Sequence, residues 1–224
     1  MVQRRTLGAA VIMVSVLGVT GGVLVFYNQS AGLHWEVELG DEITYAVRVM
    51  GFSEYWPFNG SFSPPYHVEL NNTYVTIRID GLPEIPSFPS GETFAEGILS
   101  YVKTSITGPI EYGNGTEVVS ADYSFLNNVI SQSILPVGNW PFIDSLYPDM
   151  LEPDPICDTY FSSLNASFMI GHRMYLYDAG SGWYATVDMS TGLPTNATVW
   201  ACQYYGYTFY SYEVTLTPSL PSPH

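Results

Sequence analysis

Asp41-Glu-Ile-Thr-Tyr-Ala-Val-Arg-Val49 alternates one residue at a time, with bulky apolar side chains at its odd positions from Ile43 onward. Successive side chains of a β-strand lie on opposite faces, so this segment has one apolar face and one wetter face. The preceding Gly40-Asp41 supplies a turn. Alternation of this kind is typical of an antiparallel sheet with one side in water. The segment therefore predicts a half-buried strand and a mainly β fold.

Five further runs show the same period of two, and each predicts a strand. They are Trp35–Leu39, Tyr74–Asp80, Trp183–Met189, Thr195–Tyr205 and Tyr207–Thr217, with Gly206 at the reversal between the last two.

One stretch has helical spacing instead, formed by Phe125, Leu126, Val129, Ile130 and Ile134. Asp122 or Ser124 is available as its N-cap. A second short helix is predicted over 140–147, between Gly138-Asn139 and Pro148. Strands, then helices, then strands again favour an α+β arrangement in which one antiparallel sheet curves over one or two short helices.

The predicted domain organisation follows from these elements. Residues 1–5 form a cytoplasmic N-terminus, 6–27 a transmembrane anchor and 28–34 a linker. Residues 35–217 form one β-rich extracellular domain, and 218–224 form a disordered tail. The proline-rich segment 82–91 is interpreted as a loop within the domain, because too few residues precede it for an independent core.

The membrane anchor is predicted from a charge-free run, Thr6–Tyr27, that follows Arg4-Arg5. Twenty-two residues at helical rise span about 33 Å, enough to cross the hydrocarbon core of a bilayer. The two arginines place the N-terminus inside by the positive-inside rule, so the C-terminal domain lies outside the cell membrane.

Two other fates of this segment stay open. Ser30-Ala31-Gly32 is an acceptable cleavage region for a secretory signal. Arg5-Thr6-Leu7 resembles the cut site of archaeal class III prepilin signals, which implies a type IV pilin-like filament subunit.

The charge balance excludes nucleic acid as a partner. The whole chain has 6 basic and 21 acidic residues, a net charge of −15, and charged residues make up only 12%. Removing Arg4 and Arg5 leaves 4 − 21 = −17 outside the membrane. Such a surface repels phosphate backbones.

Six Asn-x-Ser/Thr sequons predict N-glycosylation of an exported surface. They begin at Asn28, Asn59, Asn71, Asn114, Asn165 and Asn196. The alternative is that a Ser/Thr-rich exterior produced them by chance.

The two cysteines, Cys157 and Cys202, both fall in the exported part. Two cysteines without a metal motif in an oxidising compartment predict a disulfide. Two free buried cysteines are the alternative.

The opening segment Trp35-Glu-Val-Glu-Leu-Gly-Asp-Glu-Ile-Thr-Tyr-Ala-Val47 resembles the start of many uncharacterised, membrane-anchored cell-surface proteins of archaea. Ile134-Leu-Pro-Val-Gly-Asn-Trp140 and Thr191-Gly-Leu193 are similar too. This resemblance implies a location and a β-rich ectodomain but no activity. The strand–helix–strand order is also similar to half-barrel carriers of lipids and lipoproteins, which have a helix in their concave face.

No catalytic motif is present in the sequence, so no enzyme activity, cofactor or metal is predicted. His34 with Glu36, and His67 with Glu69, have minimal metal-ligand spacing but fit surface strand residues better. The acidic segment Asp144–Asp158 lacks the spacing and turn glycine of a Ca²⁺ loop.

Aromatic residues make up 15% of the chain, with 18 tyrosines, and gather in two clusters. Tyr55, Trp56, Phe58 and Phe62 fall in a proline- and glycine-rich loop, where they predict a binding surface. The second cluster, Tyr204–Tyr212, fits the core face of a strand. The predicted function is therefore a single-pass, glycosylated, acidic cell-surface protein that binds envelope proteins or glycans; an extracytoplasmic carrier of an apolar ligand is the main alternative.

Overall fold

The computed structural model describes residues 32–55, 58–61, 70–85, 102–107, 124–147, 156–205 and 208–219. The predicted anchor 6–27, the linker up to residue 31, and residues 220–224 of the predicted tail lie outside these ranges. So do most of the proline-rich segment, Trp56, Phe62 and His67.

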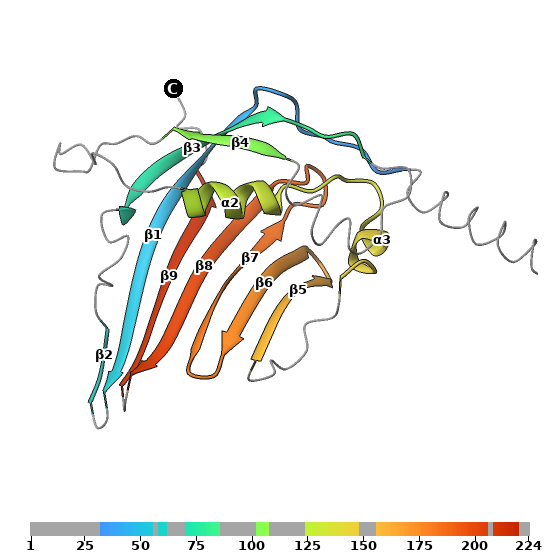
Figure 1. Ribbon diagram of the computed structural model, residues 1–224. Helices are drawn as coiled ribbons and strands as arrows, with labels where there is room; N and C mark the ends of the chain where they lie inside the picture. Colours follow the sequence, from blue (N-terminus) through green and yellow to red (C-terminus); the bar gives the residue numbers. More distant parts are fainter. Residues whose placement is uncertain are drawn as a thin grey trace, which may run out of the picture.

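The described residues form one antiparallel sheet in the strand order β4-β3-β1-β9-β8-β7-β6-β5, with β2 paired to β1 (Figure 1). The strands are β1 (Glu42–Tyr55), β2 (Phe58–Ser61), β3 (Thr73–Gly81), β4 (Lys103–Thr107), β5 (Ile156–Leu164), β6 (Phe168–Leu176), β7 (Ala179–Val187), β8 (Pro194–Tyr205) and β9 (Thr208–Pro218). The prediction of a mainly β protein with one antiparallel sheet is confirmed.

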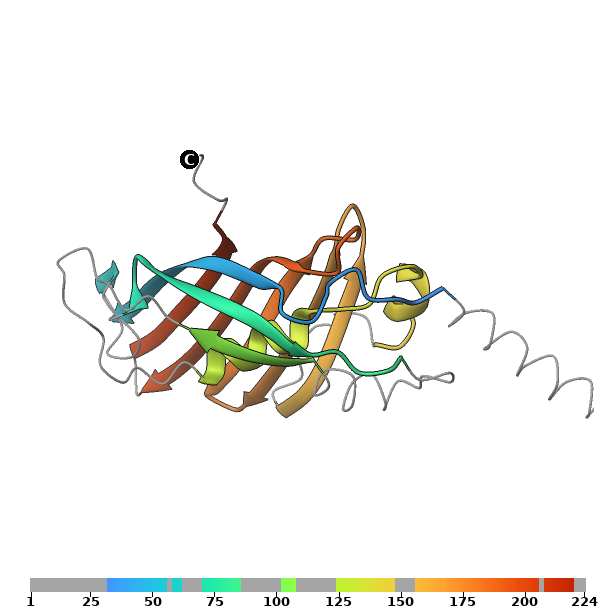
Figure 2. The same ribbon diagram turned by 90° about the horizontal axis from the view of Figure 1, so that it is seen from above.

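Two short helices accompany the sheet, α2 (Ser124–Ser133) and α3 (Trp140–Asp144). The sheet curves, and α2 lies in its concave face between β4 and the strands β7 and β8 (Figures 1 and 2). The Asn139 side chain accepts a hydrogen bond from the Phe142 amide and so caps α3, while Pro141 occupies its first turn. Both predicted helices are confirmed, although α3 ends earlier than residue 147.

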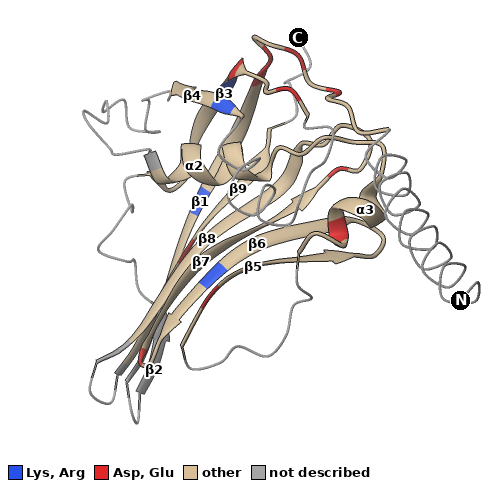
Figure 3. Ribbon diagram, turned by 45° about the vertical axis from the view of Figure 1, so that its right-hand side comes forward, with Lys and Arg blue, Asp and Glu red and all other residues tan. Residues whose placement is uncertain are grey.

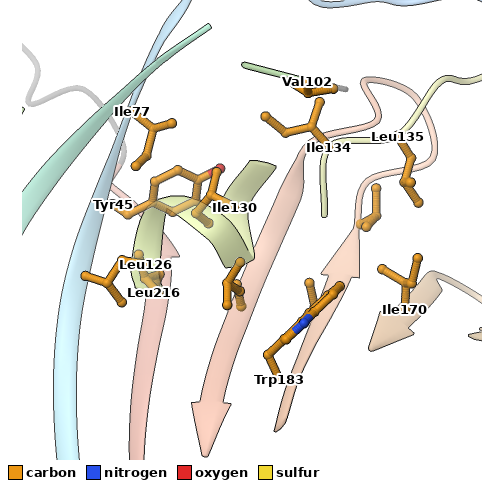
Figure 4. Packing of buried hydrophobic residues seen from close by; sticks show 14 of the residues in the cluster. Tyr45, Ile77, Val102, Leu126, Ile130, Ile134, Leu135, Ile170, Trp183 and Leu216 are labelled. Atoms are coloured by element: carbon orange, nitrogen blue, oxygen red, sulfur yellow. The ribbon is translucent and has the colours of Figure 1, made fainter. Parts of the chain in front are cut away.

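The core lies between α2 and the concave face (Figure 4). Leu126 and Ile130 of α2 are fully buried against sheet residues such as Tyr45 and Leu216. The predicted alternation along β3 is confirmed, since Val75, Ile77 and Ile79 are buried and their neighbours are not. Side chains of α2 and of the sheet thus belong to one buried cluster under the helix, the place where the carrier alternative requires a ligand.

The segment Trp35–Leu39 is not a strand, so this prediction is wrong. A local turn replaces it: the Asp41 amide donates to the Glu38 carbonyl, and the Glu38 amide donates to the Asp41 carboxylate. Gly40 has a positive φ of 94°, which glycine adopts without strain. The turn chemistry outweighs the alternating pattern, and only His34 forms an isolated bridge, to Val137.

The sequence also understated the sheet. It predicted no strands at β4, β5 and β6, and it placed residues 55–62 in a loop, where the structure has β1 continuing to Tyr55 and turning back into β2.

The predicted disulfide is wrong: Cys157 and Cys202 are both free. They stand at the ends of one cross-strand row, Cys157–Tyr175–Gly180–Cys202, which crosses from β5 to β8. Three strand spacings of about 4.8 Å separate their Cα atoms by about 14 Å. A disulfide needs less than about 7 Å, so the sheet itself holds the thiols apart.

Candidate binding surface at the hairpin end of the sheet

The sheet has two dissimilar ends. At the helix end, residues 32–41 lead into β1, and the helices α2 and α3 pack against the sheet. At the opposite end, here called the hairpin end, lie the connections β1–β2 (residues 55–58), β6–β7 (176–179) and β8–β9 (205–208) (Figure 1). The chain therefore enters the domain at one end and turns back at the other.

The structure brings the two aromatic clusters of the sequence together at the hairpin end. Tyr55 pairs with Phe58 across the β1–β2 hairpin and with Thr208 of β9. Thr208 in turn pairs with Tyr205 of β8. Segments about 150 residues apart in sequence are thus adjacent strands, and both of their turns lie at this end of the sheet. Trp56 and Phe62 lie outside the described residues.

Exposed apolar side chains surround these turns. Tyr177 lies in the β6–β7 turn, where it is 73% exposed. Leu176 and Ile156, which face each other across β6 and β5, are 59% and 55% exposed. Tyr210 of β9 is 42% exposed. Large apolar side chains with this much exposure in one region are a usual mark of a binding surface.

Part of this surface belongs to the concave face. Leu176, Ala179, Gln203 and Tyr210 form one row across β6 to β9, on the same side of the sheet as the buried Trp183. Helix α2 lies nearer the other end, so this row is not covered by it (Figure 1). The concave face is thus divided into a packed half under α2 and an open half at the hairpin end.

The second aromatic cluster divides in the same way. It was predicted to be the core face of one strand. Val214 and Leu216 of β9 are fully buried, Tyr212 is half-buried and Tyr210 is exposed. The strand therefore passes from the core into the open surface.

Acidic residues are concentrated in loops at the helix end (Figure 3). Glu36, Glu38 and Asp41 lie in the segment that leads into β1, and Glu84 follows β3. More of the described acidic residues thus lie at the helix end than at the hairpin end. The hairpin end still carries acidic residues, since Asp178 lies in the β6–β7 turn beside Tyr177 and Asp158 lies near the start of β5.

The predicted His34–Glu36 pair is in contact, with His34 Nε2 2.8 Å from Glu36 Oε1. The Gly32 carbonyl oxygen, 2.8 Å from Nδ1, raises the pKa of His34, and the Glu36 carboxylate raises it further. Within the described ranges no group of three or more His, Cys, Asp or Glu side chains could hold a metal ion. His34 and Glu36 thus form a surface pair.

A second histidine–carboxylate pair lies on the concave face near the open half. His172 Nε2 is 2.6 Å from Asp158 Oδ1, and the centroid of the Tyr160 ring lies 4.5 Å from that of the imidazole, with the two rings tilted by 50°. Asp158 belongs to the acidic segment that was weighed as a Ca²⁺ loop. In the structure, Asp158 pairs with His172. Asp144, from the same segment, accepts a hydrogen bond of 2.7 Å from the Ser162 hydroxyl.

The glycosylation sequons differ in accessibility. Asn165 lies in the exposed β5–β6 turn, whereas Asn196 of β8 is half-buried. Asn71 is also half-buried, and its side-chain oxygen accepts a hydrogen bond of 2.9 Å from the Val49 amide. Asn59 falls in β2, and Asn28 and Asn114 lie outside the described residues. Asn165 is the best placed of these for an attached glycan.

Comparisons with protein-family models, with curated proteins and with solved structures find no match. In the part of the chain that the structure describes, no helix has the length and apolar character that crossing a bilayer requires. The similarity to archaeal surface proteins and the membrane anchor at 6–27 therefore stay predictions from sequence.

Proposed function

We propose that this protein is a single-pass cell-surface binding protein, which contacts another component of the cell envelope through the hairpin end of its sheet. Residues 6–27 anchor it in the membrane with the β domain outside, and glycans on sequons such as Asn165 add solubility to a chain with few charges. The observation that carries the proposal is the gathering of exposed apolar side chains at one end of the sheet.

The position of the chain's entry supports this orientation. The described chain begins at Gly32, at the helix end, so an anchor at residues 6–27 would join the domain opposite the hairpin end. Strand β1 alone has 14 residues, which at roughly 3.3 Å each span about 46 Å. An upright domain would therefore present Tyr177 and its neighbours well beyond the lipid headgroups.

A direct test replaces the exposed side chains at each end. The full-length triple variant Leu176→Ser, Tyr177→Ser, Tyr210→Ser should bind purified cell envelopes, from which the native protein has been stripped, at least 10-fold more weakly than wild type. The control Leu39→Ser, Tyr74→Ser removes apolar side chains of similar exposure, 68% and 50%, outside the hairpin end, and should bind normally. Both variants should keep the wild-type melting temperature within a few degrees, since exposed positions contribute little to stability. Equal binding by all three proteins would refute the proposal.

A second candidate, a carrier of an apolar ligand, is favoured by one observation. Met174 and Leu176 remain 46% and 59% exposed on the concave face, next to the core. Saturable uptake of a fluorescent fatty acid, lost in Met174→Asp but retained in Tyr177→Ser, would support the carrier over the envelope-binding protein.

A further inference from the structure

The convex face of β5 to β8 is lined with aromatic rings that lie over glycines. A Cβ atom built on Gly171 would come within 2.5 Å of the Phe161 ring, and one on Gly180 within 2.7 Å of the Tyr175 ring. A Cβ atom on Gly182 would likewise come within 3.1 Å of the Trp200 ring. The glycines thus let rings approach the sheet more closely than any side chain at those positions would allow.

Arg173 lies among these rings. It pairs with Thr159 of β5 and Gly182 of β7 across the sheet, and only 8% of its surface is exposed. Its guanidinium carbon lies 5.6 Å from the centre of the Phe161 ring. Burial raises the pKa of the Tyr175 phenol, and the positive charge of the nearby Arg173 offsets part of that rise. The arginine is therefore a buried cation surrounded by apolar and aromatic groups.

This cation has no anionic partner in the described part of the chain. The Nε atom is buried without a hydrogen-bond acceptor, and the described ion pairs are those of His34, Arg78 and His172. Glu213 is the acidic residue of the same cross-strand row, three strands away and thus about 14 Å distant. A guanidinium cannot lose its charge, and a ring contact offsets only part of the desolvation of a buried cation.

The surroundings indicate what would complete the site. A carboxylate accepts two parallel hydrogen bonds from a guanidinium, a geometry that Arg favours over Lys. Tyr175 and Trp200 are half-buried, and their ring centroids lie 5.5 Å apart. The exposed parts of these two rings remain available for contact with the ring of a ligand. Aromatic residues bind flat apolar surfaces, including the C–H faces of sugars.

We infer that Arg173, Tyr175 and Trp200 bind a carboxylate carried on a ring, such as a uronic acid unit of an acidic glycan. The site lies on the convex face of β5–β8. It is separate from the open half of the concave face and does not depend on the function proposed for the hairpin end.

Calorimetric titration of the full-length protein in detergent, at constant ionic strength, tests the inference with four probes. Glucuronate should bind saturably. Glucose, which lacks the carboxylate, acetate, which lacks the ring, and inorganic sulfate should each bind at least 10-fold more weakly. No saturable binding of glucuronate, or equal binding of acetate or sulfate, overturns the inference.

Substitutions of Arg173 test whether this residue binds the carboxylate of glucuronate. Arg173→Met keeps the length of the side chain and should lose glucuronate binding at least 10-fold, while Arg173→Lys keeps the charge but should still bind more weakly than wild type. The matched control is Arg48→Met, which removes an exposed arginine from the convex face of β1. Glucuronate binding that survives in Arg173→Met, or that falls equally in Arg48→Met, contradicts the inference. The wild-type probe comparison stands on its own if Arg173→Met does not fold.

Discussion

Cys157 and Cys202 show how residue type alone can mislead. Two cysteines in an exported domain favour a disulfide, and nothing in their spacing of 45 residues argues against it. The pairing of β5 to β8 decides otherwise, because Tyr175 and Gly180 stand between the two cysteines in the same row. Burial raises the pKa of the Cys202 thiol, so this cysteine is less reactive than a solvated one.

We expect both thiols to be free in the folded protein. Titration with a thiol reagent in denaturant, without reductant, should find two thiols per chain. The variant Cys157→Ser, Cys202→Ser should melt at the same temperature with and without dithiothreitol, as should the wild type. A lower melting temperature of the wild type in dithiothreitol would show a disulfide and so a different pairing of these strands.

At the scale of single elements, α2 depends on its buried face. Ile130 is fully buried between the helix and the sheet, whereas Asn128, on the same helix, is exposed. Ile130→Ala should lower the free energy of unfolding by about 3 kcal/mol, because it removes buried methyl groups and leaves a cavity. Asn128→Ala should change it by less than about 0.5 kcal/mol. Urea denaturation measures both, and similar losses for the two would mean that α2 does not pack as described.

The sequence predicts an element well when apolar residues lie on one of its faces and polar residues on the other. Strand β3 has a buried residue at every second position, and α2 carries its apolar residues on one side, so both were predicted. In β5 and β6 the convex face is not simply polar, because it carries Phe161, Met169 and Tyr175. Apolar residues on both faces remove the period of two, so these strands were missed.

The candidate surface was predicted only in part, for a related reason. Tyr55 and Phe58 were identified because aromatic residues are unusual in a proline- and glycine-rich segment. Leu176 and Tyr177 were not, since nothing local shows that the β6–β7 turn lies at the same end of the sheet as the β1–β2 hairpin. That proximity arises from the strand order, which no short sequence motif encodes.

For the whole molecule, the strand order makes the last strand central. Strand β9 lies between β1 and β8, and so joins the half formed by β1 to β4 to the half formed by β5 to β8. Its residues Val214 and Leu216 are fully buried, and the Ser219 amide that follows it donates to the Thr44 carbonyl. The sheet is incomplete until nearly the whole chain is available, which is typical of folds with many non-local contacts.

Truncation tests this dependence. Ending the chain after Tyr205 removes β9 and leaves β1 and β8 each with an unpaired edge, so the product should lose its cooperative thermal transition and expose apolar surface to the dye ANS. Ending it after Ser219 keeps every described contact of β9 and should leave the melting temperature unchanged within about 2 °C. A cooperative transition in the shorter product would mean that one half of the sheet folds without the other, contrary to the central place of β9.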